Sequence, residues 1–378
     1  MTAGDIETVE TQYCTIAHPP SGFLLENGES IGPVTIAYET YGSLDANRSN
    51  AILVLHALTG DAHAAGFHNG ETSHGWWHDM IGPGKAFDTD RYFVICSNVL
   101  GGCRGSTGPS SENPDTGRPY GLEFPVITIK DMVNAQKALL ENLGIESILA
   151  VVGGSMGGMQ ALQWVVSYPE KVASAILIAT TSEHTPQQIA FNEVGRQAIM
   201  ADPNWNNGDY YGRDLPDKGL SVARMIGHIT YMSDDSMNEK FGRRVKDKKN
   251  LFKFSPEFEV EGYLHYRGYN FINRFDPNSY LYITKAVDSF SLANGKPLHK
   301  LLEGVKTRLL IIAFSSDWLY PPYQSQQIVK ACKMAGNNAT YCELRSNYGH
   351  DAFLVEFEEQ TYLYTHFLKK VHDEQRAA

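Results

Sequence analysis

The segment 153–158, with the sequence GGSMGG, constrains the fold of this chain more than any other feature. It follows the apolar run 148–152 and precedes the helix-forming stretch 159–163. A Gly-x-Ser-x-Gly sequence between a strand and a helix is typical of a sharp, strained turn in an α/β sheet. The glycines let strand and helix pass closely, and the serine hydroxyl stands exposed at the helix N-terminus. Elsewhere the same pattern is an ordinary glycine-rich turn, but this context predicts that Ser155 is a nucleophile.

Strand-like and helical segments alternate on both sides of Ser155, which indicates a mostly parallel sheet with helices on both faces. Thr128 and Asp131 resemble the capping box of a helix that Gly144 ends. The other expected elements are strands at 34–41, 51–56, 92–97, 148–152, 173–179, 308–314 and 340–344, and helices at 324–334 and after Phe353.

Residues 184–297 interrupt this alternation, because they are rich in Tyr and Phe and contain no buried strand pattern. Helical patterns occur there at 187–200, 222–232 and 280–292. We therefore expect an α/β core formed by residues 1–183 and 298–378, with residues 184–297 inserted as a helical lid.

The composition excludes several classes of partner. The formal net charge is −11 and no basic stripe is evident, so binding to nucleic acid or to an anionic membrane surface is not expected. The five cysteines are scattered without a Cys-x-x-Cys pair, which is typical of a reducing compartment. Residues 1–12 are acidic and polar, and no apolar run approaches the roughly 20 residues of a membrane helix. We expect a soluble, cytoplasmic protein.

A serine is a weak nucleophile at neutral pH and needs a base that a third group orients. In α/β hydrolases the chain order is Ser, acid, His, and the acid and the His lie on loops after the last strands. Asp317 follows the strand 308–314 by three residues, and His350 follows the strand ending at Leu344 by six. Each residue alone fits an ordinary loop, but the order and placement together predict a Ser155, Asp317, His350 triad.

The oxyanion formed during acyl transfer needs hydrogen-bond donors that are fixed before the reaction. The amide of Met156, at the start of the helix, is the first candidate. The loop 56–61 follows the strand 51–55 and suits the second donor, with the Leu58 amide as the expected group.

Four histidines crowd one segment: His63, His68, His74 and His78. Their spacing matches no zinc motif and no cysteine lies beside them, so we expect no metal site.

Five blocks together resemble the homoserine O-acetyltransferase family: residues 56–61, 98–109, 153–160, 316–322 and 349–354. The resemblance extends from about Pro33 to the last helix. It implies an α/β-hydrolase fold and ping-pong transfer of an acetyl group from acetyl-CoA, as co-substrate and without a bound cofactor, to the side-chain hydroxyl of L-homoserine. The product, O-acetyl-L-homoserine, serves methionine biosynthesis. The family also implies a homodimer formed through the lids.

By matching position, the resemblance gives Ser155, Asp317 and His350 as the triad. It further implies that Arg224 meets the substrate carboxylate, Asp351 its ammonium group, and that Tyr231 lines the same pocket. Homoserine is a zwitterion, and a buried site must pair both of its charges. Arg224 as a surface charge and Asp351 as a helix cap remain simpler interpretations.

Three alternatives within reach of the same triad stay open: a homoserine O-succinyltransferase, a serine O-acyltransferase, and a serine esterase or thioesterase. Succinyl-using relatives carry an arginine two residues after the triad Asp, where this chain has Leu319, which favours the acetyl donor.

Overall fold

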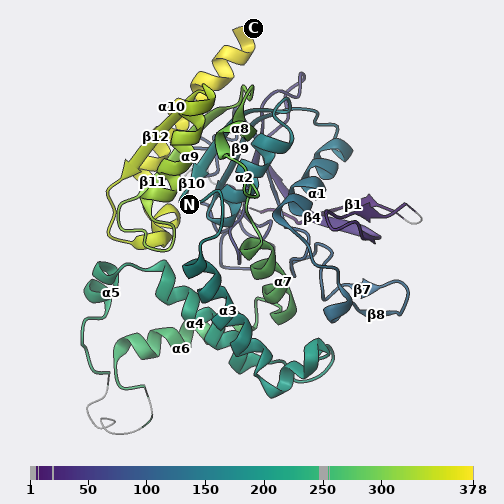
Figure 1. Ribbon diagram of the computed structural model, residues 1–378, viewed down its shortest axis with the longest axis vertical. Helices are drawn as coiled ribbons and strands as arrows, with labels where there is room; N and C mark the ends of the chain where they lie inside the picture. The colour runs from purple at the N-terminus through teal and green to yellow at the C-terminus, as the bar shows by residue number, and fades with distance from the viewer. Residues whose placement is uncertain (1–5, 7, 19–20, 247–253, 255, 378) are drawn as a thin grey trace.

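The computed structural model describes residues 6, 8–18, 21–246, 254 and 256–377. Residues 1–5 and 7 of the polar N-terminal segment therefore lie outside the described residues. A sheet with flanking helices forms one part of the molecule, and a group of helices lies beside one end of it (Figure 1).

The main sheet has eight strands in the order β1-β4-β6-β5-β9-β10-β11-β12. The pairs β1/β4 and β4/β6 are antiparallel and the remaining pairs are parallel, as expected for a mostly parallel sheet. These strands are β1 (Gln12–Ala17), β4 (Val34–Tyr41), β5 (Ala51–Leu55), β6 (Phe93–Ser97), β9 (Ile148–Gly154), β10 (Val172–Ile178), β11 (Arg308–Phe314) and β12 (Ala339–Leu344).

Alternate residues of the central strands point to opposite faces of this sheet, and each face has its own apolar cluster. On β11, Leu309 and Ile311 join the cluster that contains α1 (Ile129–Asn142), α2 (Met156–Ser167) and α9 (Pro322–Ala335). Leu310 and Ile312 join the cluster that contains α10 (Phe357–Ala377). Burial on both faces explains why these strands read as continuous apolar runs.

Most of the expected elements are present within a few residues of their predicted bounds. The capping box of Thr128 and Asp131 is formed in both directions, and Gly144 has φ +70° after the last turn. The edge strand β1 was not predicted. It lies on the antiparallel side of the sheet, where one face is less buried and its apolar pattern is correspondingly weak.

Between β10 and β11 the chain forms the helices that lie together in the lower part of Figure 1. They are α3 (Pro186–Met200), α4 (Asp217–Tyr231), α5 (Asp234–Lys240), α6 (Glu259–Ile272) and α7 (Pro277–Asp288), followed by the short α8 (Leu298–Leu302). The expected helix at 280–292 begins at Pro277, because Asp276 caps it by accepting a hydrogen bond from the Ser279 amide. Neither α5 nor α6 was predicted.

The two ends of this insertion run side by side. The amide of His184 donates to the carbonyl of Phe290 at 3.0 Å, and the amide of Leu292 donates to the carbonyl of Ser182 at 2.9 Å. The chain therefore leaves the sheet and returns to it at one point.

All five cysteines are free thiols. Among the described helices, none combines the length and the apolar character that a membrane span requires.

Candidate active site

The turn between β9 and α2 is as tight as its glycines suggest. Ser155 has φ 58° and ψ −123°, a region that side chains rarely occupy. A Cβ atom on Gly153 would lie 2.3 Å from the backbone carbon of Gly157, and one on Gly157 would lie 2.0 Å from the carbonyl oxygen of Leu55. Glycine at both positions therefore brings the start of α2 against the end of β5.

His350 and Asp317 form a buried hydrogen-bonded pair beside Ser155. The distance from His350 Nδ1 to Asp317 Oδ2 is 2.7 Å. The other carboxylate oxygen of Asp317 accepts hydrogen bonds from the amides of Leu319 and Tyr320, at 3.0 and 2.9 Å, so the turn after β11 fixes its orientation. With Nδ1–H donated to the carboxylate, Nε2 of His350 is the nitrogen that can accept a proton.

A buried histidine holds the loop after β5 in place. His56 Nε2 accepts from the Val99 amide at 3.1 Å, so Nδ1 carries the proton and bonds the carbonyl of Ala57 at 2.8 Å. Burial lowers the pKa of His56, which keeps its imidazole neutral. This anchor fixes the turn that carries Leu58, next to the first turn of α2.

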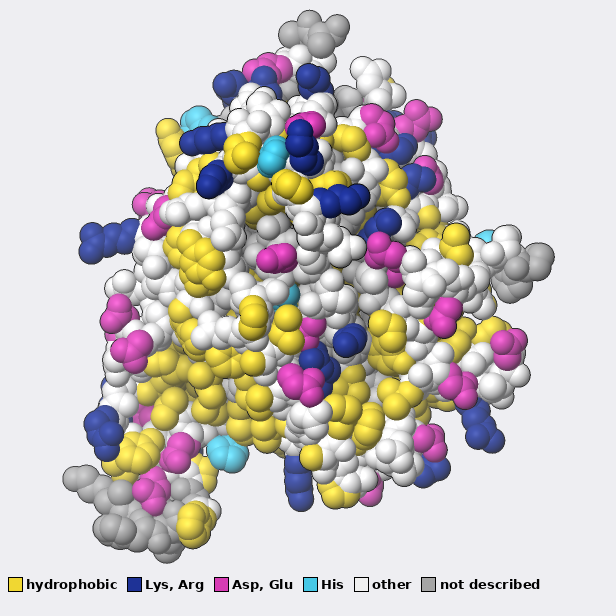
Figure 2. Space-filling model, viewed as in Figure 1, with side chains coloured by type: hydrophobic (Ala, Val, Ile, Leu, Met, Phe, Trp, Pro, Cys, Tyr) yellow, Lys and Arg dark blue, Asp and Glu magenta, His cyan; other side chains and the backbone are white. Residues whose placement is uncertain are grey.

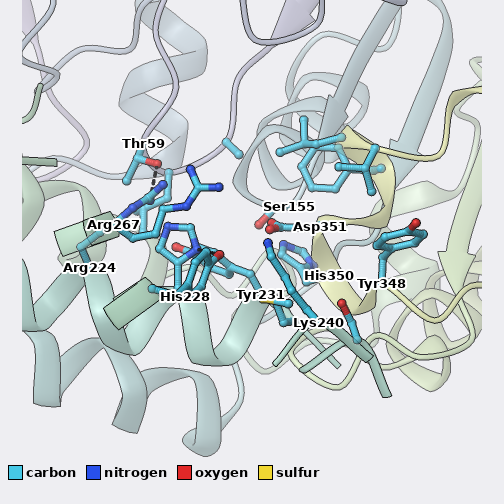
Figure 3. A pocket seen from close by; sticks show the side chains of 18 of the residues that line it. Thr59, Ser155, Arg224, His228, Tyr231, Lys240, Arg267, Tyr348, His350 and Asp351 are labelled. Carbon is cyan, nitrogen blue, oxygen red and sulfur yellow. Dashed lines mark hydrogen bonds between the residues drawn. The ribbon is translucent and has the colours of Figure 1, made fainter. Parts of the chain in front are cut away.

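A cavity of about 730 Å³ opens in front of Ser155 and His350. Figure 3 shows Arg224, Tyr231 and Asp351 around it, together with the two triad side chains that line it. Most of the residues that sequence analysis selected therefore line one cavity, and Asp317 is bonded to His350 next to it. A carboxylate and a guanidinium on the walls of one cavity suit a small zwitterion.

Arg224 projects from α4 and is held by two neighbours. Its Nη1 donates to Thr59 Oγ1 at 3.1 Å, and its guanidinium lies 4.7 Å from the ring centre of Phe271. Burial raises the pKa of Asp351, while the charges of His350 and Arg224 oppose this rise. Burial also raises the pKa of Tyr231, so its hydroxyl remains a neutral hydrogen-bonding group.

Several other residues of the cavity wall were missed by sequence reasoning, among them His228, Glu239, Lys240 and Arg267. Burial and the charge of Arg224 lower the pKa of His228 to about 3, so it is neutral at physiological pH. Lys240 and Arg267 lie over the ring of Tyr263, at 4.6 and 5.3 Å from its centre. They come from α5 and α6, whose positions no sequence motif indicates.

A second, smaller cavity of about 50 Å³ also touches Ser155. Leu58, Met156, Leu319 and Tyr320 are among the residues that line it. It therefore lies beside the expected oxyanion donors, and its volume is close to that of a single small group.

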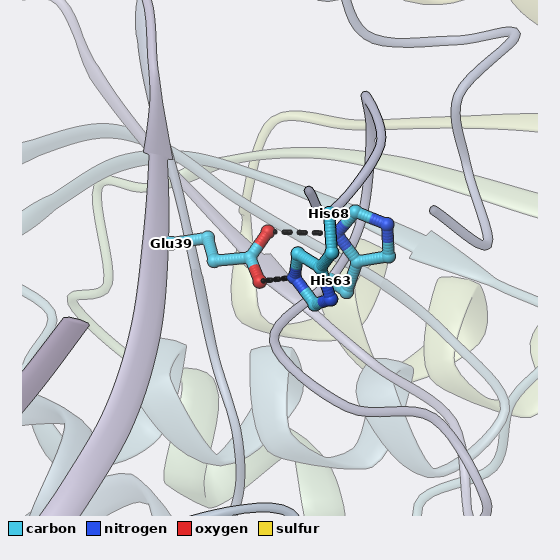
Figure 4. A group of neighbouring side chains, drawn as sticks. All are labelled: Glu39, His63 and His68. Atoms are coloured by element: carbon cyan, nitrogen blue, oxygen red, sulfur yellow. Dashed lines mark hydrogen bonds and ion pairs between the residues drawn. The ribbon is translucent and has the colours of Figure 1, made fainter. Parts of the chain in front are cut away.

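The four crowded histidines occupy two pairs. His74 and His78 stack with ring centres 4.9 Å apart, whereas His63 and His68 meet Glu39, as Figure 4 shows. The ligand-type atoms of these last three residues lie within 4.8 Å of one another. Sequence spacing could not reveal this group, because Glu39 lies on the distant strand β4.

The carboxylate of Glu39 is fully hydrogen-bonded, whereas Nε2 of His63 is buried without a partner. The carboxylate accepts from His68 and Thr11 at 2.8 Å each, from Tyr41 at 2.8 Å and from His63 at 2.9 Å. Four donors occupy the four lone-pair sites of a carboxylate, so its negative charge is stabilised without any further ligand.

This cluster predicts an acid-sensitive contribution to stability. Burial would raise the pKa of Glu39, but the bonds from His63, His68 and Tyr41 outweigh it and lower the pKa from 4.5 to about 2. The unfolded chain then binds the proton more readily, so the stabilisation is complete above about pH 4.5 and is lost as the pH falls towards 2. Glu39→Gln should lower the free energy of unfolding by roughly 3 kcal/mol at neutral pH, and this difference should shrink on acidification.

Urea unfolding of the wild type and the variant across a pH series measures this effect, with exposed Glu146→Gln as control. A wild-type to Glu39→Gln difference that did not change with pH would contradict the proposed role of the ionised carboxylate.

Comparison with known proteins places the chain in a family. Residues 50–357 match the model of the alpha/beta hydrolase fold. A homoserine O-acetyltransferase of Methanohalobium evestigatum is 61% identical over 96% of this chain and 74% of that protein. The crystal structure of homoserine O-acetyltransferase from Bacillus anthracis aligns with a TM-score of 0.87 and 32% identity, covering 97% of this chain and 98% of that one. The crystal structure of esterase E22 also aligns with a TM-score of 0.87 and 33% identity, covering 95% of this chain and 100% of that one.

The fold and the strained serine beside a His–Asp pair define an α/β-hydrolase-fold enzyme. Within that class, the identity to the curated relatives identifies the family. The chain belongs to the homoserine O-acetyltransferase family, which confirms the resemblance found in its sequence.

Proposed function

We propose that this protein transfers the acetyl group of acetyl-CoA to the side-chain hydroxyl of L-homoserine, giving O-acetyl-L-homoserine and CoA for methionine biosynthesis. The observation that carries the proposal is the convergence of Ser155, His350, Arg224 and Asp351 on one cavity of about 730 Å³. Identity of 61% to a curated homoserine O-acetyltransferase supports the substrate assignment.

In the first half-reaction, His350 Nε2 takes the proton of Ser155, and Ser155 Oγ attacks the thioester carbonyl carbon. The amides of Met156 and Leu58 stabilise the oxyanion, and each such donor typically contributes about 3 kcal/mol. The carbon–sulfur bond breaks, and CoA leaves with the proton from His350.

In the second half-reaction, His350 takes the proton of the homoserine hydroxyl, which attacks the acetyl ester of Ser155. Arg224 pairs with the substrate carboxylate in a charge-assisted bond, and Asp351 pairs with its ammonium group. Tyr231 offers its neutral hydroxyl beside them. The oxygen of Ser155 leaves with the proton from His350, which restores the enzyme.

We propose residues 184–297 as the lid. Two of its cations, Lys240 and Arg267, line the same cavity, which Glu239 lines as well. The phosphate groups of CoA are anionic, and in a protein of net charge −11 such local cations offset the overall repulsion. We propose that these two side chains meet the phosphate end of the acyl donor.

The acyl pocket predicts a preference for acetyl-CoA over succinyl-CoA. Leu319 lines the cavity of about 50 Å³ beside Ser155, where a succinyl carboxylate would be buried without a cation. The wild type should use acetyl-CoA at least about tenfold better, which corresponds to about 1.4 kcal/mol, and Leu319→Arg should narrow this ratio. The measurement is kcat/KM with each donor, and Leu319→Met controls for a change of shape alone. Succinyl-CoA matching acetyl-CoA on the wild type would refute the prediction.

We further propose a cytoplasmic homodimer formed through the lids, as the family resemblance implies. Hydrophobic side chains gather over the lid helices in Figure 2. Large exposed apolar residues on α3, α4 and α6 are Val194, Val222, Ile229, Tyr266 and Tyr269. Such surfaces are typical of interaction sites, and light scattering of the purified protein tests the dimer.

A substrate matrix tests the reaction itself. Acetyl-, succinyl- and propionyl-CoA are each offered with homoserine, serine or water, and CoA release and product are measured. Efficient CoA release with water alone would indicate a thioesterase, and preference for serine or for succinyl-CoA would indicate the corresponding transferase.

A further inference from the structure

A second buried chain of polar side chains leads from the insertion to the cavity beside Ser155. His184 Nδ1 lies 3.0 Å from Asp288 Oδ1, and His184 Nε2 lies 2.9 Å from the hydroxyl of Tyr320. The side chains of His184 and Asp288 are only 3% and 7% exposed. They stand at the two ends of the insertion, and the mechanism above uses neither of them.

The charges around Asp288 indicate which groups donate and which accept in the hydrogen bonds from Asp288 through His184 to Tyr320. Burial raises the pKa of Asp288, but bonds from His184, Asn192 and Arg196 outweigh it and hold the pKa below its usual value. Arg196 supplies the opposite charge to Asp288 at 2.6 Å, and the same carboxylate accepts the Nδ1–H of His184. Nε2 of His184 is then an acceptor, and the Tyr320 hydroxyl donates to it.

Tyr320 lines the small cavity beside Ser155, next to the expected position of the acetyl group of an acyl-enzyme. Tyr320 and Ser155 both line the cavity of about 50 Å³, and the rings of Tyr320 and His350 are 5.0 Å apart. Burial and the charge of Asp317 raise the pKa of Tyr320, and a hydrogen bond with Ser155 opposes them. Tyr320 is therefore a neutral phenol between His184 and the nucleophile.

We propose that the Tyr320 hydroxyl occupies the hydrogen-bonding position on His184 that a water would otherwise take, and so protects the acetyl-enzyme from hydrolysis. The inference rests on the proposed acetyl-serine intermediate. A cavity of about 15 Å³ already holds a water if at least two polar partners are present, and a buried imidazole acceptor next to this cavity would recruit one.

The reaction that Tyr320 prevents can be written in full. A water held by His184 Nε2 attacks the ester carbonyl carbon while one of its protons passes to that nitrogen. The ester bond to Ser155 Oγ breaks, Oγ takes up the proton that His184 had accepted, and acetic acid leaves and ionises in solvent. A His–Asp pair beside the ester would thus act as a general base for water.

The test is the lifetime of the acetyl-enzyme in Tyr320→Phe. The enzyme is loaded with acetyl-CoA alone, freed of excess donor, and followed by intact-protein mass spectrometry without homoserine. Removing the hydroxyl leaves an unsatisfied acceptor on His184 and should shorten the half-life about tenfold or more. Tyr323→Phe, at a half-exposed tyrosine three residues away, should leave it unchanged.

A double variant separates this role from simple loosening of the site. Tyr320→Phe with His184→Leu removes the acceptor that would hold the water, so the lifetime should return towards that of the wild type. The inference is overturned if Tyr320→Phe, with an unchanged melting temperature, keeps the wild-type lifetime, or if the double variant hydrolyses as fast as the single one. If the wild type acquires no acetyl group on Ser155, the proposed function itself fails, and that result appears before any lifetime is compared.

Discussion

Ser155→Ala should reduce turnover of acetyl-CoA and homoserine by at least about 10⁴-fold while leaving the fold intact. Removing the serine of a catalytic triad typically lowers kcat by a factor of this size, because the base then has no group to activate. Alanine fits the turn, since the backbone at φ 58° is strained to a similar degree for either residue. The measurement is the steady-state rate, together with the melting temperature of the variant.

Two controls sharpen this prediction. Mass spectrometry after mixing with acetyl-CoA alone should find one acetyl group on the peptide that contains Ser155, and none in the variant. Ser167→Ala, at the last residue of α2, should keep wild-type turnover. An alanine variant that retained a substantial fraction of the wild-type rate would show that another residue is the nucleophile.

Arg224→Ala should impair the second half-reaction far more than the first. A charge-assisted pair in a desolvated site is typically worth about 2–4 kcal/mol, which is roughly 30- to 1000-fold in kcat/KM for homoserine. Acylation by acetyl-CoA involves no carboxylate at this position, so the rapid release of CoA should be nearly unchanged. Stopped-flow measurement of that release separates the two steps.

Arg224→Lys should recover part of the loss, since it keeps the charge but not the planar fork. Exposed Lys218→Ala on the same helix serves as the matched control. Equal slowing of both half-reactions would mean that Arg224 acts through its contacts with Thr59 and Phe271 on the position of α4 instead.

The features that could be predicted from sequence are those in which local pattern and chemistry coincide. Ser155 lies in a motif whose glycines are explained by the tight turn between a strand and a helix. Asp317 and His350 each follow an apolar strand after a few residues. Parallel strands bring their carboxyl ends to one edge of the sheet, so strand positions alone suffice to bring such loops together.

Other features depend on contacts between distant segments and leave no local signal. The Glu39 cluster joins β4 to His63 and His68, which lie 24 and 29 residues later in the sequence. The role proposed for Tyr320 depends on its hydrogen bond to His184, which is paired with Asp288 at the other end of the insertion. Arg224 was selected through family resemblance, and Lys240 and Arg267 were not selected, because the sequence of an amphipathic helix does not reveal which of its cations faces a cavity.

The side-by-side ends of the insertion have a consequence for how the chain folds. Strands β10 and β11 are paired neighbours in the sheet, although the whole helical insertion separates them in the sequence. The entropic cost of closing a loop rises only with the logarithm of its length, by about 0.6 kcal/mol per doubling. Even a long insertion therefore adds little to the free-energy cost of pairing β10 with β11. Helices that first pack on one another would bring His184 and Phe290 together, and the search for the β10–β11 pairing would then span a short effective loop. The insertion can thus gain or lose residues at its far end without slowing the assembly of the sheet.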